Sequence, residues 1–296
     1  MRTKKNKNKK RKNKTRKTKF IKDKCSPKRK GNEIKISCYT RDSLNKLKNI
    51  WNNKHPDMKI TSKKYINIWK DLKSLLSNTC YRESCWLTEL YESEHLKEKE
   101  YLINFAAKKP NSWKKNPTEW LSSLDIIEVM KRWENIDKEF EFIGPSPIDY
   151  DTHIMYNECV WEELCEFSLS DTLNRGKKKI GIIFNLDKHN QPGSHWVAVY
   201  LDLKKKEIYY FDSYGDSIPK QINKFIKKVQ CQGKKLDLNI KKILLKTRHQ
   251  YSDSECGMYS LYFIIQLLKG KPISHFNKRI SDKYMKKLRN MYFNDI

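Results

Sequence analysis

The sequence predicts an α+β fold: a small mixed sheet flanked by helices, preceded by a helical arm and a basic tail. Apolar residues recur at helical spacing before Gly176 and again at the end of the chain. Between these parts the sequence is β-branched or alternates between apolar and polar residues, which is typical of strands. Strands framed by helices on both sides indicate an α+β domain. With 296 residues, the chain can form one large domain or a smaller one with an arm.

Basic residues dominate the beginning of the chain. The formal net charge is +28, and residues 1–30, with 17 Lys/Arg and one acid, carry +16 of it. From Arg2 to Lys19 there is no apolar residue, so we predict a disordered basic tail over residues 1–30. It could bind nucleic acid non-specifically or serve as a nuclear address, or it could be merely solvated. No base-reading motif accompanies it.

Composition also limits the class of protein. The longest apolar stretch, residues 261–268, is far short of the roughly 20 residues that span a bilayer, so we predict no membrane partner. No apolar segment of a secretory signal follows the basic start, so the eight cysteines indicate free thiols in a reducing compartment. Cys80 and Cys85 have C-x4-C spacing without a matching second pair, which favours buried thiols over a metal site. We predict no metal and no cofactor.

Residues 31–116 are predicted to form the helical arm. Apolar residues recur at helical spacing over residues 44–51 and 65–76, and Pro56 separates the two segments. A linker with prolines, residues 109–117, closes the arm.

Residues 117–296 form the second predicted domain. Thr118 opens an amphipathic helix whose apolar face would contain Trp120, Leu124, Ile127 and Met130. A loop over residues 144–152 and a helical segment over residues 160–173 follow. Strands are predicted at residues 179–186, 195–203, 207–213 and 242–247, and further helices at residues 219–229, 255–268 and 281–291.

Cys256 is a candidate nucleophile. It lies where a polar loop enters a long apolar helix, and Asp253 or Ser254 is a plausible N-cap. In the first helical turn, the helix dipole and free amides stabilise a thiolate. Gly257, which has no Cβ, would let a substrate backbone approach closely. Alternatively, a cysteine at the start of a buried helix is simply a small apolar residue.

His195 and Asp212 are candidates for a base and the carboxylate that orients it. A two-residue turn at Lys204 and Lys205 would pair the strands so that Asp212 faces Val197, on the same face as His195 and diagonal to it. A register slip of two places the pair directly opposite, whereas a slip of one puts them on different faces. Taken singly, the histidine could be a strand-edge residue and the aspartate a turn residue.

Gln250 is a candidate oxyanion donor. It precedes Cys256 by six residues, at the end of an apolar strand, and its carboxamide could act together with the Cys256 backbone amide. A loop glutamine is more often just solvated. His249 and His189 are rival histidines, but neither has a carboxylate placed by sheet pairing, so His195 is preferred.

The four candidates follow one another in the chain order His195, Asp212, Gln250, Cys256. The histidine lies in an HW pair, and Gln250 and Cys256 lie in a Q-x5-CG motif. This arrangement resembles the Ulp1/adenain-type cysteine proteases. The segments FIGPSPIDYDT, YYFDSYG and HQYSDSECGMYSLYFI resemble a branch found in large nucleocytoplasmic DNA viruses, related to poxvirus and asfarvirus core-protein proteases. The resemblance covers about residues 117–296. Many cellular members have Asp directly before the nucleophile, whereas this chain has Glu255.

The resemblance implies a papain-like cysteine protease fold of the Ulp1/adenain type and a role for each residue. Cys256 would be the nucleophile, His195 the general base, Asp212 its orienting carboxylate and Gln250 the oxyanion donor. Trp196 would roof a narrow cleft that admits Gly-Gly or Gly-Ala before the cut; alternatively, it is core packing that faces away from His195.

Three hypotheses remain open. The first is a viral endopeptidase that cleaves core or structural precursors during virion maturation, in the virion and host cytoplasm, with the nucleus as an alternative address. The second is a deconjugating protease for ubiquitin-like proteins. The third is a basic nucleic-acid-binding virion protein on an inactive protease scaffold, which the complete set of four residues disfavours.

Overall fold

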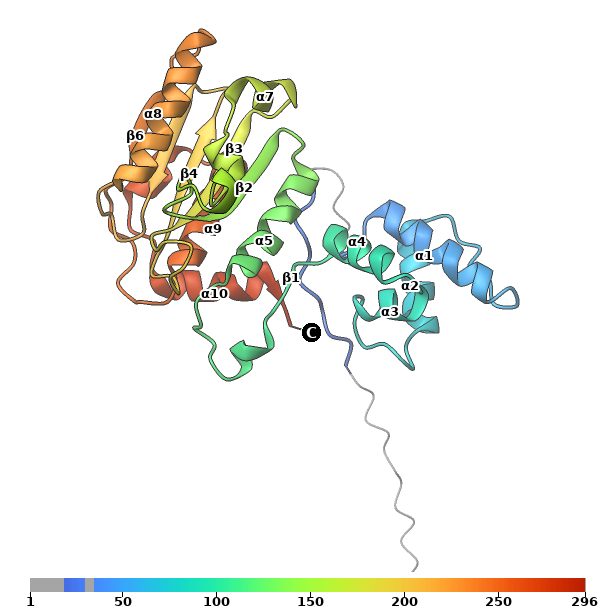
Figure 1. The fold of residues 1–296 in the computed structure, drawn as a ribbon. Helices are drawn as coiled ribbons and strands as arrows, with labels where there is room; N and C mark the ends of the chain where they lie inside the picture. The colour runs from blue at the N-terminus through green and yellow to red at the C-terminus, as the bar shows by residue number, and fades with distance from the viewer. Residues whose placement is uncertain (1–18, 30–34, 296) are drawn as a thin grey trace, which may run out of the picture.

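The computed structural model describes residues 19–29 and 35–295. Its centre is a five-stranded sheet in the order β2-β3-β4-β5-β6 (Figure 1). The strands are β2 (Phe140–Pro147), β3 (Lys179–Asn185), β4 (Trp196–Asp202), β5 (Glu207–Phe211) and β6 (Lys241–Leu244). The three central strands are antiparallel, and each edge strand is parallel to its neighbour, which confirms the predicted mixed sheet.

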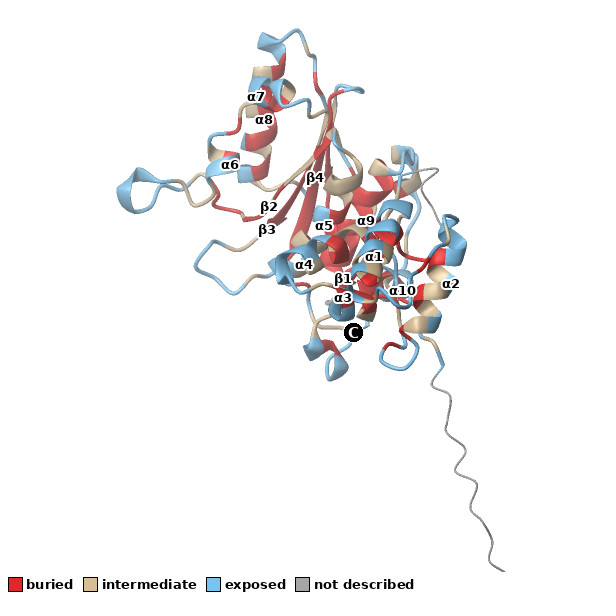
Figure 2. Cartoon of the chain, turned by 90° about the vertical axis from the view of Figure 1, so that its right-hand side faces the viewer, coloured by how far each residue is buried: buried red, intermediate tan, exposed pale blue. Residues whose placement is uncertain are grey.

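Helices cover both faces of the sheet (Figures 1 and 2). On one face lie α5 (Ser123–Ile136), α9 (Cys256–Leu268) and α10 (Asp282–Tyr292), and on the other α6 (Glu162–Cys165), α7 (Leu169–Asn174) and α8 (Lys220–Lys235). Strand β4 shows why both faces are covered. Ala198 and Tyr200 pack toward α9, whereas Val197 and Val199 pack toward α8, because successive side chains of a strand point to opposite faces.

The arm has its own apolar cluster, centred on Tyr39, Trp86 and Phe105. Its elements are α1 (Arg41–Lys54), α2 (Tyr65–Leu75), α3 (Cys85–Leu90) and α4 (Glu94–Asn104). The chain then continues through β1 (Ala107–Lys108) and the 3-10 helix η1 (Asn111–Lys114), and two further 3-10 turns, η2 (Met155–Asn157) and η3 (Ile273–Asn277), lie in the second half.

Several contacts attach the arm to the sheet domain. β1 pairs in parallel with β7 (Phe293–Asn294) near the C-terminus. Arg132 of α5, which is buried, donates a hydrogen bond to the Phe105 carbonyl at 2.8 Å. The arm is therefore packed against the sheet domain and is not a free extension.

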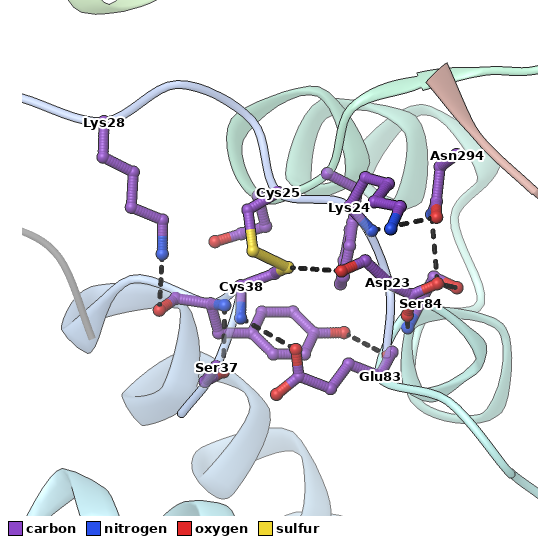
Figure 3. Close-up of a disulfide and its surroundings, with 12 residues drawn as sticks. Asp23, Lys24, Cys25, Lys28, Ser37, Cys38, Glu83, Ser84 and Asn294 are labelled. Atoms are coloured by element: carbon purple, nitrogen blue, oxygen red, sulfur yellow. Dashed lines mark hydrogen bonds between the residues drawn. A yellow bond between two sulfur atoms is a disulfide. The ribbon is translucent and has the colours of Figure 1, made fainter. Parts of the chain in front are cut away.

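The predicted disordered tail is corrected in its second half. Residues 1–18 and 30 lie outside the described residues, but residues 19–29 are packed against the arm. Asp23 is buried and accepts hydrogen bonds from the Ser84 amide at 2.8 Å and from the Asn294 side chain at 3.0 Å (Figure 3). This segment is ordered because one buried carboxylate joins it to both α3 and the C-terminus.

The prediction of free thiols is also corrected. Six of the eight cysteines form disulfides: Cys25–Cys38, Cys80–Cys85 and Cys159–Cys165. The first fastens the N-terminal segment to the start of the arm (Figure 3). The fold places these pairs at Cα–Cα distances of 4.8, 5.6 and 6.2 Å, which suit a disulfide. The prediction of free thiols is based only on the lack of an apolar signal segment, which says nothing about the distances between cysteines in the fold. Cys231 and Cys256 are free.

Three element predictions are wrong in detail. α5 begins at Ser123, after a capping box formed by Ser122 and Asp125, so Trp120 lies before the helix and Leu124 is exposed. The predicted loop at residues 144–152 contains the end of β2, whose Gly144 and Pro145 are tolerated because the strand lies at the sheet edge. The helical segment at residues 160–173 is split into α6 and α7.

In the described part of the chain, no helix has the length and apolar character to cross a membrane.

Candidate active site

Cys256 lies in the first turn of α9, as predicted, and is its first residue, one position after the predicted start at Glu255. Its side chain is buried. The N-cap is Glu255, not the predicted Asp253 or Ser254, and it makes no side-chain capping bond. Every residue of α9 except Leu268 is buried, so the helix and its cysteine are held firmly against the sheet. The first-turn amides have no partner within the helix, and the dipole adds partial positive charge, so this position favours an anionic sulfur.

His195 and Asp212 meet in the register predicted from the hairpin. Ala198 pairs with Phe211, so the next position along the two strands places Val197 opposite Asp212. The strands are connected by four residues and not by the predicted two. The Nε2 atom of His195 lies 2.7 Å from Oδ1 of Asp212. Both residues are buried. The Cys256 thiol also interacts with the imidazole. Because Nε2 contacts Asp212, Nδ1 is the ring nitrogen that remains available to the sulfur.

The electrostatics of this site favour a protonated imidazole. Burial alone would lower the pKa of His195, but hydrogen bonds to Asp212 and Cys256 and their negative charges together raise that pKa to about 9. An imidazolium beside the sulfur stabilises a thiolate, and a buried carboxylate on the far side stabilises the imidazolium. The three residues can therefore act as an ion pair with an orienting carboxylate.

Gln250 lies beside this group but is fully buried. Its Oε1 accepts a 2.7 Å hydrogen bond from the Ser213 hydroxyl, which fixes the orientation of the amide. Its Nε2 donates to the Tyr214 hydroxyl at 3.4 Å and to the Ser252 carbonyl. The described contacts therefore hold the carboxamide in place and occupy both of its N–H groups.

Trp196 and Gly257 both lie against Leu121. The Trp196 side chain is buried, and its indole N–H donates a hydrogen bond to the Leu121 carbonyl at 3.0 Å. Trp196 also lines a cavity of about 660 Å³. A Cβ on Gly257 would lie only 3.0–3.2 Å from the Leu121 side chain. Thus the missing Cβ of Gly257 makes room for the Leu121 side chain. The approach of a substrate backbone to Gly257 stays a prediction.

The cavity beside Trp196 has a mixed lining. Trp120, Trp161 and Pro192 contribute apolar surface, and Glu119 and Asp187 contribute carboxylates. The loop that precedes His195 forms one wall of this cavity, and Trp196, the neighbour of His195, lines it. His195 and Cys256 themselves are not among its lining residues.

The rival histidines have other surroundings. His249 is fully buried, its Nδ1 accepts a hydrogen bond from the Ile280 amide, and burial, together with Arg279 and His275, lowers its pKa to about 4. His189 does have a carboxylate partner, Asp149 at 2.8 Å, but it comes from the segment after β2 and not from sheet pairing. Within residues 19–29 and 35–295, neither of these histidines has a thiol among its hydrogen-bond partners.

Sequence reasoning missed several supporting residues. Ser213 and Tyr214, in the turn after Asp212, contact Gln250, and Leu121 contacts both Trp196 and Gly257. Glu255 forms a buried ion pair with Arg289 of α10 at 2.9 Å. The DSYG turn motif was the available signal for Tyr214, whereas nothing local to the sequence indicates the partner of Glu255.

Two clusters of side chains lie close enough to hold a metal ion, among the residues that the structure describes. They are His153 with Cys159 and Cys165, and Cys80 with Cys85 and Glu89. In both, the two cysteines form a disulfide, so their thiolates are not free to bind a metal. Neither cluster includes Cys256 or His195.

Comparisons with known proteins point to one protein family. Residues 170–296 match the Ulp1 protease family, C-terminal catalytic domain. The chain is 32% identical over 287 residues to "Putative thiol protease R355" of Acanthamoeba polyphaga mimivirus, covering 91% of this chain and 92% of that protein. It is 30% identical over 247 residues to a cysteine protease of African swine fever virus (isolate Tick/Malawi/Lil 20-1/1983), and the match covers 76% of this chain and 89% of that protein.

A solved structure shares the fold. The crystal structure of a protease of African swine fever virus superposes with a TM-score of 0.61 at 23% identity, covering 92% of this chain and 96% of that one. The fold is therefore that of a cysteine protease with a small mixed sheet between helices. The chain belongs to the Ulp1 protease family and is a cysteine protease that acts on protein substrates.

Proposed function

We propose that this protease is an endopeptidase that cleaves viral core or structural precursors after small-residue motifs of the Gly-Gly-X or Gly-Ala-X type during virion maturation. The observation that carries the mechanism is the contact of one imidazole with both Asp212, at 2.7 Å, and Cys256 at the start of α9. The virion and host cytoplasm are the proposed location, with the nucleus as an alternative.

The first half of the reaction forms an acyl-enzyme. The Cys256 thiolate attacks the scissile carbonyl carbon, and the C=O π electrons move to oxygen. The Cys256 backbone N–H and the Gln250 amide are the proposed donors to this oxyanion, with one Gln250 N–H turning from its present partner to the substrate. As the C–N bond breaks, the His195 imidazolium gives its proton to the leaving amine, and a thioester remains.

The second half releases the product. Neutral His195 takes a proton from water, the hydroxide adds to the thioester carbon, and the C–S bond breaks to give a carboxylic acid and the thiolate. Asp212 holds the ring orientation in both halves. Trp196 is the proposed wall that restricts residues next to the cut to small ones, which its place on the cavity and its fixed indole support.

A second candidate function is removal of a ubiquitin-like protein. It is favoured by the name of a relative in African swine fever virus (isolate Warthog/Namibia/Wart80/1980), a SUMO-1 cysteine protease that is 29% identical over 247 residues. Ubiquitin-like proteins that end in Gly-Gly would satisfy the same cleft.

The test compares the wild type with Cys256→Ala, with Cys231→Ala as the matched control because Cys231 is the other free cysteine and is exposed. A Gly-Gly vinyl sulfone should label the wild type and the control but not Cys256→Ala. Cleavage of a core-protein precursor with Gly-Gly-X sites should follow the same pattern. An unlabelled wild type, or equal cleavage by Cys256→Ala, would overturn the mechanism. Cleavage of ubiquitin-like fusions alone would establish the second candidate.

A further inference from the structure

Tyr214 contacts three members of the candidate site: His195, Asp212 and Gln250. Its ring is stacked on the His195 imidazole, with centroids 4.7 Å apart and planes 19° from parallel. Its backbone N–H donates to Oδ1 of Asp212 at 2.9 Å, the same oxygen that His195 contacts. Its hydroxyl accepts a 3.4 Å hydrogen bond from Nε2 of Gln250.

We propose that Tyr214 is a positioning residue that aligns His195, Asp212 and Gln250 for the reaction at Cys256, with its ring as the support for the imidazolium. The proposal rests on the proposed function. It assigns a separate task to each part of the residue: the backbone fixes Asp212, the ring fixes His195, and the hydroxyl fixes Gln250.

The turn that contains Tyr214 is built to hold this position. Gly215 closes it with a hydrogen bond from its amide to the Asp212 carbonyl at 3.0 Å. Its φ is +79°, and a Cβ there would lie 2.7 Å from the Lys246 carbonyl oxygen, so a side chain is excluded by both conformation and space. Tyr214 is thus anchored on both sides, by Ser213 against Gln250 and by Gly215 against the segment after β6.

The ring stack has an electrostatic consequence. A cation over the face of an aromatic ring is attracted by the quadrupole of that ring, so the stack favours the charged imidazole over the neutral one. The charged groups around Tyr214 and His195 are Asp212, Cys256, Asp253 and Arg248, and Arg248 lies 5.5 Å from the Tyr214 centroid. Burial, then the charges of Cys256 and Asp253, raise the pKa of Tyr214, so its hydroxyl remains protonated in the working range.

The test separates the ring from the hydroxyl. Tyr214→Phe keeps the stack and loses the contact with Gln250, whereas Tyr214→Leu loses both. Tyr251→Leu is the matched control, because Tyr251 is an exposed neighbour whose ring lies against Arg248 and Arg279. All variants carry Cys231→Ser, so that Cys256 is the single free thiol.

Two measurements are made on the full chain. The first is the rate of Cys256 alkylation by iodoacetate against pH, which falls as the imidazolium beside the thiolate loses its proton. For Tyr214→Leu this descending limb should move down by about half to one pH unit, the size of a cation–π contact. Tyr214→Phe and Tyr251→Leu should keep the limb of the parent.

The second measurement is cleavage of a fluorogenic Gly-Gly peptide. Tyr214→Phe should lower kcat by roughly three- to tenfold with KM unchanged, as expected for loss of one hydrogen bond to the oxyanion donor. Tyr251→Leu should leave both constants unchanged. A parent in which Cys256 is alkylated only in the pH range of an ordinary thiol would overturn the proposed function. If Cys256 of the parent is alkylated at lower pH than an ordinary thiol, but the Tyr214 variants have the same descending limb and the same kcat as the parent, the role of Tyr214 is overturned and the proposed function stands.

Discussion

At the scale of single residues, Asp212 shows how the site keeps its charge. The carboxylate is buried, and one of its oxygens accepts hydrogen bonds from both His195 and the Tyr214 amide. A buried charge is tolerated only when it is paired and hydrogen-bonded. The imidazolium of His195 supplies that pair, so the carboxylate and the protonated ring stabilise each other.

This pairing predicts the alkaline side of the pH profile. Because hydrogen bonds to Asp212 and Cys256 raise the pKa of His195 to about 9, the imidazolium persists through neutral pH and is lost as the pH rises through that value. We expect kcat/KM on a Gly-Gly peptide to be flat from neutral pH to about 8 and to fall tenfold per unit well above 9. Stopped-flow or plate-reader rates across this range will check it.

Asp212→Asn is the matched variant for the same profile. It keeps the shape of the side chain but removes the charge that helps to raise the pKa of His195. The alkaline limb should move below pH 9, and kcat/KM at neutral pH should fall by roughly 100-fold or more. An alkaline limb at the same pH in both proteins would show that Asp212 does not set the charge of the ring.

At the scale of elements, the start of α9 is held by α10. Glu255 directly precedes Cys256 and is fully buried, and Nε of Arg289 donates to its carboxylate at 2.9 Å. The Arg289 guanidinium also donates to the Ser254 carbonyl at 3.3 Å and lies 4.5 Å from the Trp113 ring. One side chain of α10 therefore fixes the two residues that lead into the nucleophile.

Arg289→Met should destabilise the protein strongly. Removing one partner leaves the Glu255 carboxylate buried without its counter-charge, which typically costs about 3–5 kcal/mol. Lys131→Met is the control, because both side chains of its ion pair with Glu128 are exposed and such a pair is worth about 1 kcal/mol or less. Urea unfolding followed by tryptophan fluorescence measures both. Equal midpoints for the two variants would contradict a structural role for the Glu255–Arg289 pair.

The elements also show what the sequence could and could not predict. The strand alternation around His195 gave the correct register to Asp212, because side-chain direction along a strand follows directly from residue order. β2 was missed because Gly144 and Pro145 are turn residues that an edge strand also accepts. The contacts of Glu255 with Arg289 and of Gly257 with Leu121 join elements far apart in the chain, and no local pattern encodes such a meeting.

At the scale of the whole molecule, the N-terminal segment connects the arm to the sheet domain. Cys25 is bonded to Cys38, and the neighbouring Lys24 amide donates to the Asn294 side chain at 3.0 Å (Figure 3). Residues from the two ends of the chain thus meet at the base of the arm. The disulfide limits how far this segment can move even when the hydrogen bonds open.

The double variant Cys25→Ser/Cys38→Ser should lower the free energy of unfolding. The bond closes a loop with a sequence separation of 13, for which loss of the cross-link costs about 3 kcal/mol. Cys231→Ser, at an exposed free cysteine, should change stability by at most about 0.5 kcal/mol. Denaturant unfolding without reductant measures both. If the double variant and the wild type unfold at the same midpoint, this bond does not hold the segment.

The basic start of the chain can be tested by a deletion. Since residues 19–29 belong to the folded part, the deletion should remove residues 1–18 only, which carry 11 lysines and arginines and no acid. We propose that they bind nucleic-acid phosphates by counterion release, so the deletion should weaken binding to a duplex and flatten the dependence of log K on log salt. Gly-Gly peptide cleavage should stay unchanged, because His195, Asp212 and Cys256 are held by the sheet and α9. Fluorescence anisotropy at several salt concentrations measures the binding. If the affinity and the slope of log K against log salt are unchanged after the deletion, residues 1–18 do not contribute to binding.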